Sequence, residues 1–306
     1  MKKLILFVIT LIGLSITELL LCNYTIENPD KFNTNVELDL LYAFENQSSI
    51  EFIEGCFRIL PDPNHRRKKS FNNGTPLLIS LGHQHSDWQE KIVPWLISRG
   101  ADVNAVDDHG DSVLMNAGLN ASATTVKTLL NAGAKVAYAS RKKVTALHYA
   151  AQGNCEVIPL LVKAGADINA RDQDGNTPLM HAVTTRQKTC VQTLLKSGAD
   201  TNITDNENAT PLIVISERGS GLYVSNTPET RFEILQLLLA HKADVNKTDK
   251  YGESALMRAS WFEEEKSLAL LLQAGADVSL KNNKGKTALD MAKHKNNARI
   301  VKLLTK

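Results

Sequence analysis

The sequence predicts an all-α fold, in which about seven helix-turn-helix units joined by β-turn loops stack into one array. Two short sequence patterns, the landmarks defined below, recur with a common period of about 33 residues. Residues typical of helix starts and helix ends then indicate that one period contains two helices and a turn. A period of 33 residues is typical of repeat architectures, in which each unit buries its apolar face against its neighbours.

The first landmark is Thr or Ser, then a variable residue, then Leu. Its copies are separated by 37, 33, 32, 33, 44 and 33 residues, and they begin at Thr75, Ser112, Thr145, Thr177, Thr210, Ser254 and Thr287. The second landmark is Gly or Lys followed by Ala. Its copies are separated by 33, 32, 33, 44 and 33 residues, and they begin at Gly100, Gly133, Gly165, Gly198, Lys242 and Gly275. Because both landmarks follow the same steps, the sequence indicates internal repeats.

The order of elements within a unit is clearest in the fourth copy. Thr177 is a good helix N-cap, and Pro178 suits the first helical position because its missing N–H leaves no bond unmade. A second apolar helix follows, which includes Leu194. Gly198 then supplies the left-handed conformation that ends a helix, and an Asp-x-Asn segment with an Asp-Gly pair turns the chain back.

Residues Val144–Arg171 and Gly175–Asn202 match the pattern Gly-x-Thr-Pro-Leu-His-x-Ala-Ala through Val-x-x-Leu-Leu-x-x-Gly-Ala-Asp-x-Asn most closely. In this pattern the sequence resembles the ankyrin-repeat family, over about residues 73–305. The resemblance implies an ankyrin-repeat solenoid that binds other proteins with its loop tips and with the first helix of each unit.

Several positions depart from the family pattern. Lys143 and Asn208 replace the turn Gly, and Lys242 replaces the helix-ending Gly at an expected cost of about 1 kcal/mol. The first and fifth units are longer than the rest, with the extra residues around Gly82–Gln89 and Gly219–Thr230. An insertion in a stacked array must project from a loop, and the sequence leaves open whether these loops are functional or simply solvated.

The N-terminus predicts export. Lys2 and Lys3 precede an apolar run, Leu4–Leu21, so we expect residues 1–22 to be a signal peptide or signal anchor. Cleavage near Cys22, lipidation of Cys22 and retention as an anchor all remain open. In each case the rest of the chain is expected in the periplasm, or attached to the membrane and facing the periplasm, of a bacterium.

The remaining chain divides into two regions. Residues 28–72 are expected to form an N-terminal helical cap, from two amphipathic segments at Val36–Phe44 and Ile50–Leu60, followed by a basic linker. Residues 73–306 are expected to form the repeat array. The net charge of +2 and an aromatic content of 6% argue against nucleic-acid binding.

No catalytic constellation is present in the sequence: it has no nucleophile elbow, phosphate loop or His-Glu-x-x-His helix. We therefore predict no enzyme activity, no catalytic residues, no cofactor and no metal site, and we interpret the cluster of His83, His85 and Asp87 as a polar loop. His148 and His181 are expected to be structural. Cys155 and Cys190 are interpreted as packing residues, although export would permit a disulfide.

The resemblance assigns the partner-binding residues by position. On the loops they are Asp108, His109, Arg141, Lys142, Arg171, Gln173, Asp174, Asn176, Asn206, Glu207, Lys250, Tyr251, Asn283 and Lys284. At the ends of the first helices they are Gln152, Thr184, Glu217, Trp261 and Phe262.

Two features of this predicted surface stand out. Exposed aromatic side chains at Tyr251, Trp261 and Phe262 are expected to be binding hot spots, although Trp261 and Phe262 could instead fold back into the core. Lys142 and its neighbours form a basic patch, and Asp172 and Asp174 are expected to form an acidic one that would orient a partner of complementary charge.

The function predicted from these features is protein binding by an exported, monomeric scaffold. An exported ankyrin array resembles immunity proteins that neutralise lipase effectors of type VI secretion, which implies that the concave face would block the effector's active site. Two other interpretations stay open: a periplasmic structural or stress-protection scaffold, and a secreted effector that binds host proteins.

Overall fold

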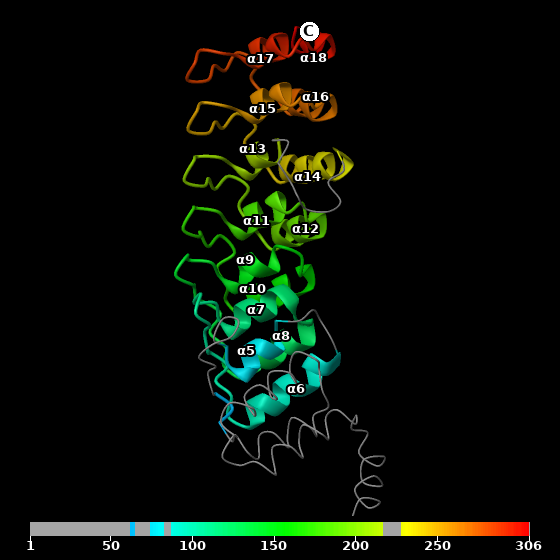
Figure 1. Ribbon diagram of the computed structural model, residues 1–306. Helices are drawn as coiled ribbons and strands as arrows, with labels where there is room; N and C mark the ends of the chain where they lie inside the picture. Colours follow the sequence, from blue (N-terminus) through cyan, green and yellow to red (C-terminus); the bar gives the residue numbers. More distant parts are fainter. Residues whose placement is uncertain (1–61, 65–73, 83–86, 217–227, 306) are drawn as a thin grey trace, which may run out of the picture. The chain divides into compact units, whose positions relative to one another are not determined.

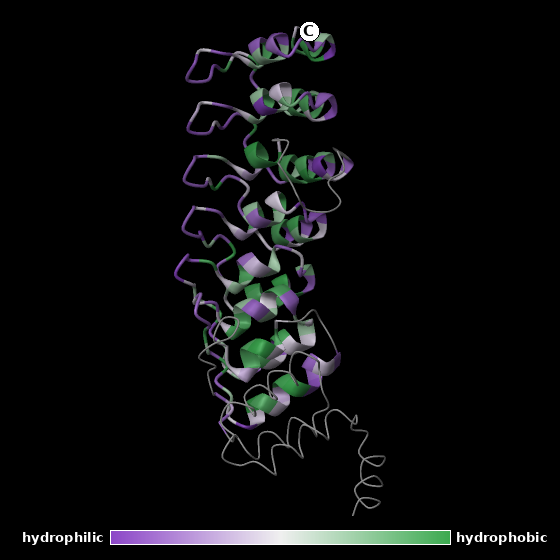
Figure 2. Cartoon of the chain, in the orientation of Figure 1, coloured by the Kyte–Doolittle hydropathy of each residue, from purple (hydrophilic) through white to green (hydrophobic). Residues whose placement is uncertain are grey.

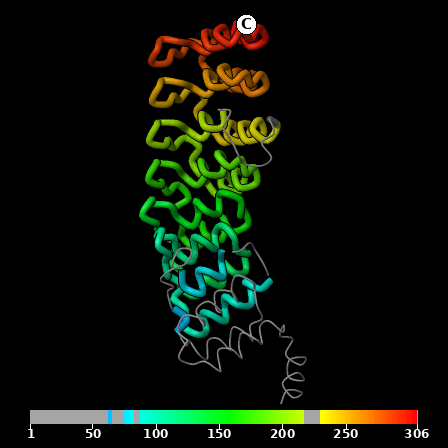
Figure 3. Tube along the Cα trace, viewed as in Figure 1, coloured from blue at the N-terminus to red at the C-terminus, as the bar shows by residue number. Residues whose placement is uncertain are grey.

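The computed structural model describes residues 62–64, 74–82, 87–216 and 228–305 (Figure 1). The chain forms two compact regions, Met1–Ser140 and Arg141–Lys306, and each contains several of the repeat units. Within Arg141–Lys306 the helix pairs lie one above another and their loops project from the same side (Figure 3). The described residues contain fourteen α-helices in seven pairs and no extended strand, which confirms the predicted all-α ankyrin-repeat array.

Each pair joins a short first helix to a second helix. The first helices are α5 (Pro76–Ser80), α7 (Val113–Asn120), α9 (Ala146–Ala150), α11 (Pro178–Thr184), α13 (Pro211–Ile215), α15 (Ala255–Trp261) and α17 (Ala288–His294). The second helices are α6 (Asp87–Ser98), α8 (Ala123–Asn131), α10 (Ile158–Lys163), α12 (Lys188–Lys196), α14 (Pro228–Ala240), α16 (Glu265–Gln273) and α18 (Ala298–Leu304), and the 3₁₀ turn η3 (Cys155–Val157) precedes α10.

The predicted helix caps are present in most units. The hydroxyl oxygens of five N-cap residues accept a hydrogen bond from the backbone N–H of the third helical residue; they belong to Ser112, Thr177, Thr210, Ser254 and Thr287. Such a cap stabilises a helix by about 1 kcal/mol. This contribution matters here because helices of five to eight residues have little stability of their own.

Within Met1–Ser140 and within Arg141–Lys306, the core lies between the helices of successive pairs. The Leu of the first landmark is at most 2% exposed in six of the seven units, as are apolar residues of the second helices such as Leu161 and Leu194. Ala150, Ala182 and Ala259 are completely buried, and their small side chains let neighbouring helices approach closely. Figure 2 shows apolar residues concentrated on the helices and polar residues on the projecting loops.

Asp-x-Asn segments link several pairs of successive repeat units. In a representative link, the Asn202 side chain accepts a hydrogen bond from the Asp244 N–H (2.7 Å) and donates one to the Lys242 carbonyl (3.1 Å). Asn64 makes equivalent bonds with Asp102 (2.6 Å) and Gly100 (3.0 Å). Asn64 therefore corresponds to the linking Asn of a repeat, and it comes before the first described helix pair. The predicted helical cap lies outside the described residues.

The residues that replace glycine adopt the expected backbone. Lys143, Asn208 and Lys242 have φ angles of 57°, 60° and 64°, which lie in the left-handed region. The repeat therefore keeps its turn geometry without glycine at these positions, at a conformational cost. Most of the Gly219–Thr230 insertion lies outside the described residues, as do residues 1–61. Among the described residues, no helix is both long enough and apolar enough to span a bilayer.

The interpretation of Cys155 and Cys190 as packing residues is wrong, because they form a disulfide with a Cα–Cα distance of 4.6 Å. Cys155 begins η3, and Cys190 lies in the first turn of α12 in the next unit. Their slots in the repeat differ by three residues. This offset is less than one helical turn, so side chains on neighbouring helices can still meet.

Candidate functional site

The loop tips within Arg141–Lys306 are tied together by backbone hydrogen bonds. Each tip donates an N–H to a carbonyl of the preceding tip, at distances of 2.7–2.9 Å, in the pairs Gln173 to Lys142, Asn206 to Asp174, Lys250 to Glu207 and Asn283 to Tyr251. The loops therefore form one continuous edge, here called the loop edge. It holds many of the predicted partner-binding side chains on a fixed backbone.

An Asp closes the base of three of these loops, and Asn282 takes the same place in the last one. Asp172 Oδ1 accepts hydrogen bonds from the N–H groups of Asp174 (2.9 Å) and Asn176 (2.8 Å). Asp249 does the same in the sixth unit, with Tyr251 (2.8 Å) and Glu253 (2.9 Å). The expectation that Asp172 contributes to an acidic surface patch is wrong, because the residue is only 8% exposed and its carboxylate bonds the backbone of its own loop.

Glycine is required where one loop approaches the next. Gly175 has a φ of +83°, and a Cβ placed there would lie 2.6 Å from the Asn206 side-chain oxygen and 2.8 Å from the Asn206 backbone nitrogen. Gly252 has a φ of +73°, and its Cβ would lie 2.8 Å from the Asn283 side-chain oxygen. Because Gly175 and Gly252 have no side chain, the following loop comes close enough to form its backbone hydrogen bond with the loop before it.

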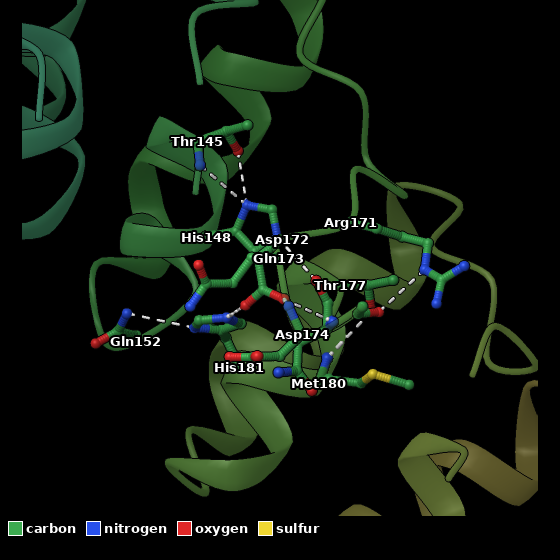
Figure 4. A network of polar contacts seen from close by, with 12 residues as sticks. Thr145, His148, Gln152, Arg171, Asp172, Gln173, Asp174, Thr177, Met180 and His181 are labelled. Atoms are coloured by element: carbon green, nitrogen blue, oxygen red, sulfur yellow. Dashed lines mark hydrogen bonds and ion pairs between the residues drawn. The ribbon is translucent and has the colours of Figure 1, made fainter. Parts of the chain in front are cut away.

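A polar network lies behind the loop edge between the third and fourth units (Figure 4). His181 Nε2 lies 2.9 Å from Asp172 Oδ2, and His181 Nδ1 lies 3.4 Å from the Gln152 side-chain nitrogen. His148 packs edge-on against His181, with ring centroids 5.0 Å apart. The network joins side chains of α9 to α11 and to the loop before it.

His148 is held neutral in this network. Burial, followed by the repulsion of His181, lowers the pKa of His148 to about 4. Its Nδ1 accepts the Thr145 N–H (3.2 Å), so its Nε2 carries the proton and donates to the Asn176 carbonyl (3.1 Å). For Asp172, burial alone would raise the pKa of the carboxyl, but hydrogen bonds from His181 and from Asn176 N–H lower it.

His148, Asp172 and His181 place three potential ligand atoms within 4.8 Å of one another. A metal ion needs a free lone pair from each ligand. Both ring nitrogens of His148 already have backbone partners, and one of them bears a proton. The donor chemistry therefore fits a network that fixes the loop, in agreement with the structural role expected for both histidines.

Most of the predicted partner-binding residues lie on the surface. The exposed ones are Asp108, His109, Arg141, Lys142, Arg171, Gln173, Asp174, Thr184, Asn206, Glu207, Lys250, Tyr251, Trp261, Asn283 and Lys284. Gln152, Asn176 and Phe262 are half-buried, and Glu217 lies outside the described residues. Exposure is consistent with binding, and the binding roles themselves stay predictions.

Some of these side chains already stabilise the loop edge. Asn206 donates from its amide to the Gln173 carbonyl (2.9 Å), and Asn283 donates to the Lys250 carbonyl (2.9 Å). Glu207 and Lys250 form an ion pair, and this hydrogen bond raises the pKa of Lys250. These residues are therefore less available to a partner than their exposure suggests.

A surface cavity lies between the sixth and seventh units. This cavity, here called the C-terminal groove, has a volume of about 490 Å³ and is lined by residues that include Arg258, Trp261, Phe262, Lys284, Lys286 and Met291. Trp261 is 38% exposed, so it does not fold back into the core. Lys286 and Met291 were absent from the predicted site; the surplus of Lys and Arg after residue 280 was the signal available for Lys286.

Comparisons with known proteins agree with this architecture. Residues 83–172, 139–205, 204–282 and 225–306 match the family model described as ankyrin repeats in three copies. The chain is 33% identical over 208 residues to the B-cell lymphoma 3 protein homolog of Mus musculus, covering 66% of this chain and 37% of that protein. It is 31% identical over 175 residues to neurogenic locus notch homolog protein 1 of Xenopus laevis, covering 56% of this chain and 6% of that protein.

A third relative is SH3 and multiple ankyrin repeat domains protein 2 of Homo sapiens, which is 26% identical over 222 residues, or 71% of this chain and 11% of that protein. The chain thus spans less than two fifths of the length of each of these three relatives. All three are eukaryotic, so they support the repeat family and give no support to the bacterial immunity group. On the match over residues 83–306, the chain belongs to the ankyrin-repeat family.

Proposed function

We propose that the chain is an exported scaffold that binds a partner protein along its loop edge and first helices. Ankyrin-repeat scaffolds typically act by binding rather than by catalysis. The observation that carries the proposal is the continuous ladder of hydrogen bonds between loop tips, which presents side chains that differ from unit to unit on a fixed backbone. A preorganised surface of this kind loses little conformational entropy on binding.

The more specific proposal is an immunity protein that covers the active site of a secreted lipase-type toxin in the bacterial envelope. It rests on the combination of the apolar segment Leu4–Leu21 with a binding array. A periplasmic structural or stress-protection scaffold and a secreted effector that binds host proteins are the alternatives. Retention of the chain in the membrane fraction would count against a secreted effector.

The disulfide supports the proposed export. Disulfides persist mainly in oxidising compartments, such as the periplasm and the extracellular space, and are rare in reducing ones. Cys155 and Cys190 are bonded across two units. A phosphatase fused after residue 30 should therefore be active outside the cytoplasm. An inactive fusion would contradict the proposed export of the chain.

Protein binding is tested by affinity capture from the cells that make the chain. The test variant reverses exposed charges of the loop edge, Lys142→Glu and Asp174→Lys. The control variant reverses exposed charges at the ends of second helices, Lys163→Glu and Lys196→Glu. We expect one partner that the wild type and the control variant capture and the test variant loses. Equal capture by all three would remove the loop edge as the binding surface.

The immunity role needs a separate test. The gene next to that of the scaffold is expressed with a periplasmic signal, and growth is measured with and without the scaffold. We expect toxicity that the wild type relieves and the loop-edge variant does not. A non-toxic neighbour, or toxicity that the scaffold leaves unchanged, would favour one of the two alternative roles.

A further inference from the structure

The last repeat has a charge unlike the rest of the chain. Residues 281–306 contain eight Lys or Arg residues and one Asp, whereas the whole chain has a net charge of only +2. The other residues are therefore net acidic. A local excess of positive charge attracts a partner of opposite charge and increases its rate of association.

Within the C-terminal groove the acidic side chains already have partners in the protein. Arg258 forms ion pairs with Asp249 (2.6 Å) and Glu253 (2.8 Å). Asp290 accepts hydrogen bonds from the N–H and the hydroxyl of Thr287, both at 2.9 Å, and so caps α17. Asp290 keeps its negative charge, which interacts with Lys286 and Lys293. Because Glu253 is paired with Arg258, the side chains that line the groove still carry more positive than negative charge.

Lys284 and Lys286 line the same groove and are exposed. Neither forms an ion pair with any residue that the structure describes. Two ammonium groups two residues apart on one loop therefore face a cavity whose own carboxylates have partners. This arrangement is complementary to one or two carboxylates supplied from outside.

The apolar part of the groove is held in place before any partner arrives. The Trp261 ring stacks on His294, with centroids 5.6 Å apart and planes 7° apart, and the Lys295 ammonium lies 4.1 Å from the Trp261 centroid. Phe262 and Met291 complete this side. A fixed, partly exposed Trp beside apolar side chains is typical of a protein-binding hot spot.

We propose that the C-terminal groove binds an extended acidic segment of a partner protein. An apolar side chain of that segment packs against Trp261, and neighbouring carboxylates bind Lys284 and Lys286. This inference rests on the proposed protein-binding function. A protein segment fits better than a nucleic acid, because base stacking along a strand uses several separate exposed rings. Among the described Trp, Tyr and Phe residues that line the groove only Trp261 is exposed, and the exposed His294 ring is already stacked on it.

The probe is a fluorescein-labelled peptide with one Phe between two Asp-Glu pairs, titrated with the full chain and followed by fluorescence anisotropy. The same peptide with Asn and Gln in place of the acids tests the charge. Single-stranded DNA and phosphatidylglycerol vesicles test the other anionic surfaces. We expect saturable binding of the acidic peptide, with weaker binding of the neutral peptide, the DNA and the vesicles.

The variants separate the groove from the general charge of the repeat. We expect Lys284→Gln with Lys286→Gln to weaken binding by about tenfold, and Trp261→Ala to have a similar effect. The matched control is Lys281→Gln with Lys302→Gln, which removes the same charge from exposed positions outside the groove lining, and should weaken binding by less than about twofold. Melting temperatures of all variants identify any loss of folding.

Equal weakening by both lysine pairs, preference for DNA or vesicles, or no saturable peptide binding would overturn the proposal. The natural partner provides an independent measurement. If a partner captured on the loop edge binds the Lys284 and Lys286 variant as tightly as the wild type, the groove proposal fails and the protein-binding function stands.

Discussion

The fourth and sixth units share one backbone framework but place different side chains around it. In both, an Asp closes the loop and a basic side chain nine residues later bonds its second oxygen: His181 with Asp172 (2.9 Å), and Arg258 with Asp249 (2.6 Å). Around His181 the space is closed by His148 from the preceding unit. Around Arg258 it opens into the C-terminal groove.

The difference lies in the side chains that fill the same slots in neighbouring units. Thr184 ends the first helix of the fourth unit, whereas Trp261 ends that of the sixth and projects over the groove. The slot of Cys190 in the fourth unit is held by Ser267 in the sixth. The loop Asp therefore keeps the same backbone role in both units, while the neighbouring side chains decide whether the space beside it is closed by a ring or open as a groove.

The largest effect is expected from breaking the disulfide, a covalent link that the fourth unit has and the sixth lacks. Cys155 and Cys190 are 35 residues apart, so reduction should lower the free energy of unfolding by about 3–4 kcal/mol. Chemical denaturation with and without reductant measures this change. The double variant Cys155→Ser with Cys190→Ser is the control, and its stability should not respond to reductant. A wild type that does not respond either would contradict the disulfide.

Acid should destabilise the region of His148 through protonation of its ring. The pKa of His148 is lowered to about 4 in the folded protein from an ordinary value of 6.5, so the unfolded chain binds its proton first as the pH falls. Stability from the neutral ring is therefore complete above about pH 6.5 and is lost as the pH falls to about 4, by about 3 kcal/mol. The Arg258 region has no histidine in the equivalent slot, where Ile213 stands.

Denaturation curves between pH 7.5 and pH 4 measure this loss. The matched variant is His148→Met, because Met115, Met180 and Met257 hold the same slot in other units. Its stability should depend less on pH across this window than that of the wild type. An equally steep pH dependence would assign the acid sensitivity to other groups.

Substitution of Gly175 or Gly252 tests whether both loops need close approach to the next loop. Gly175→Ala combines left-handed strain with contacts under 3.0 Å to Asn206, and should destabilise the protein by about 2–3 kcal/mol. Gly165→Ala is the control, because Gly165 has a φ of +96° with nothing within 4 Å of its Cβ, and strain alone should cost about 1 kcal/mol. Equal losses of stability for Gly175→Ala and Gly165→Ala would mean that the two loops can move apart without a cost in free energy.

The smallest effect compares the last residue of α15 with that of α11. Trp261→Ala removes the stacking on His294 and the contact with Lys295, and should lower the free energy of unfolding by about 1 kcal/mol. Thr184→Ala, at the same slot, should change it by less than about 0.5 kcal/mol. A loss above about 3 kcal/mol for Trp261→Ala would indicate that the ring belongs to the core and not to a binding surface.

The sequence by itself determined the fold. Thr177-Pro178, Gly198 and their repeated equivalents fix where helices begin and end, because capping and left-handed turns depend on local residue chemistry. Seven helix pairs follow from that local information. The positive φ at Lys143, Asn208 and Lys242 was predictable for the same reason, since a fixed period shows which residue must occupy each turn.

The tertiary structure decided which side chains meet. The disulfide, the contact of the His148 ring with the His181 ring and the pairing of Glu207 with Lys250 all join residues from different units. The C-terminal groove depends in the same way on how α15 packs against α17. The period fixes a residue's slot within its own unit, but contacts between units depend on distances of a few ångströms across the stack, which the packing of the helices sets.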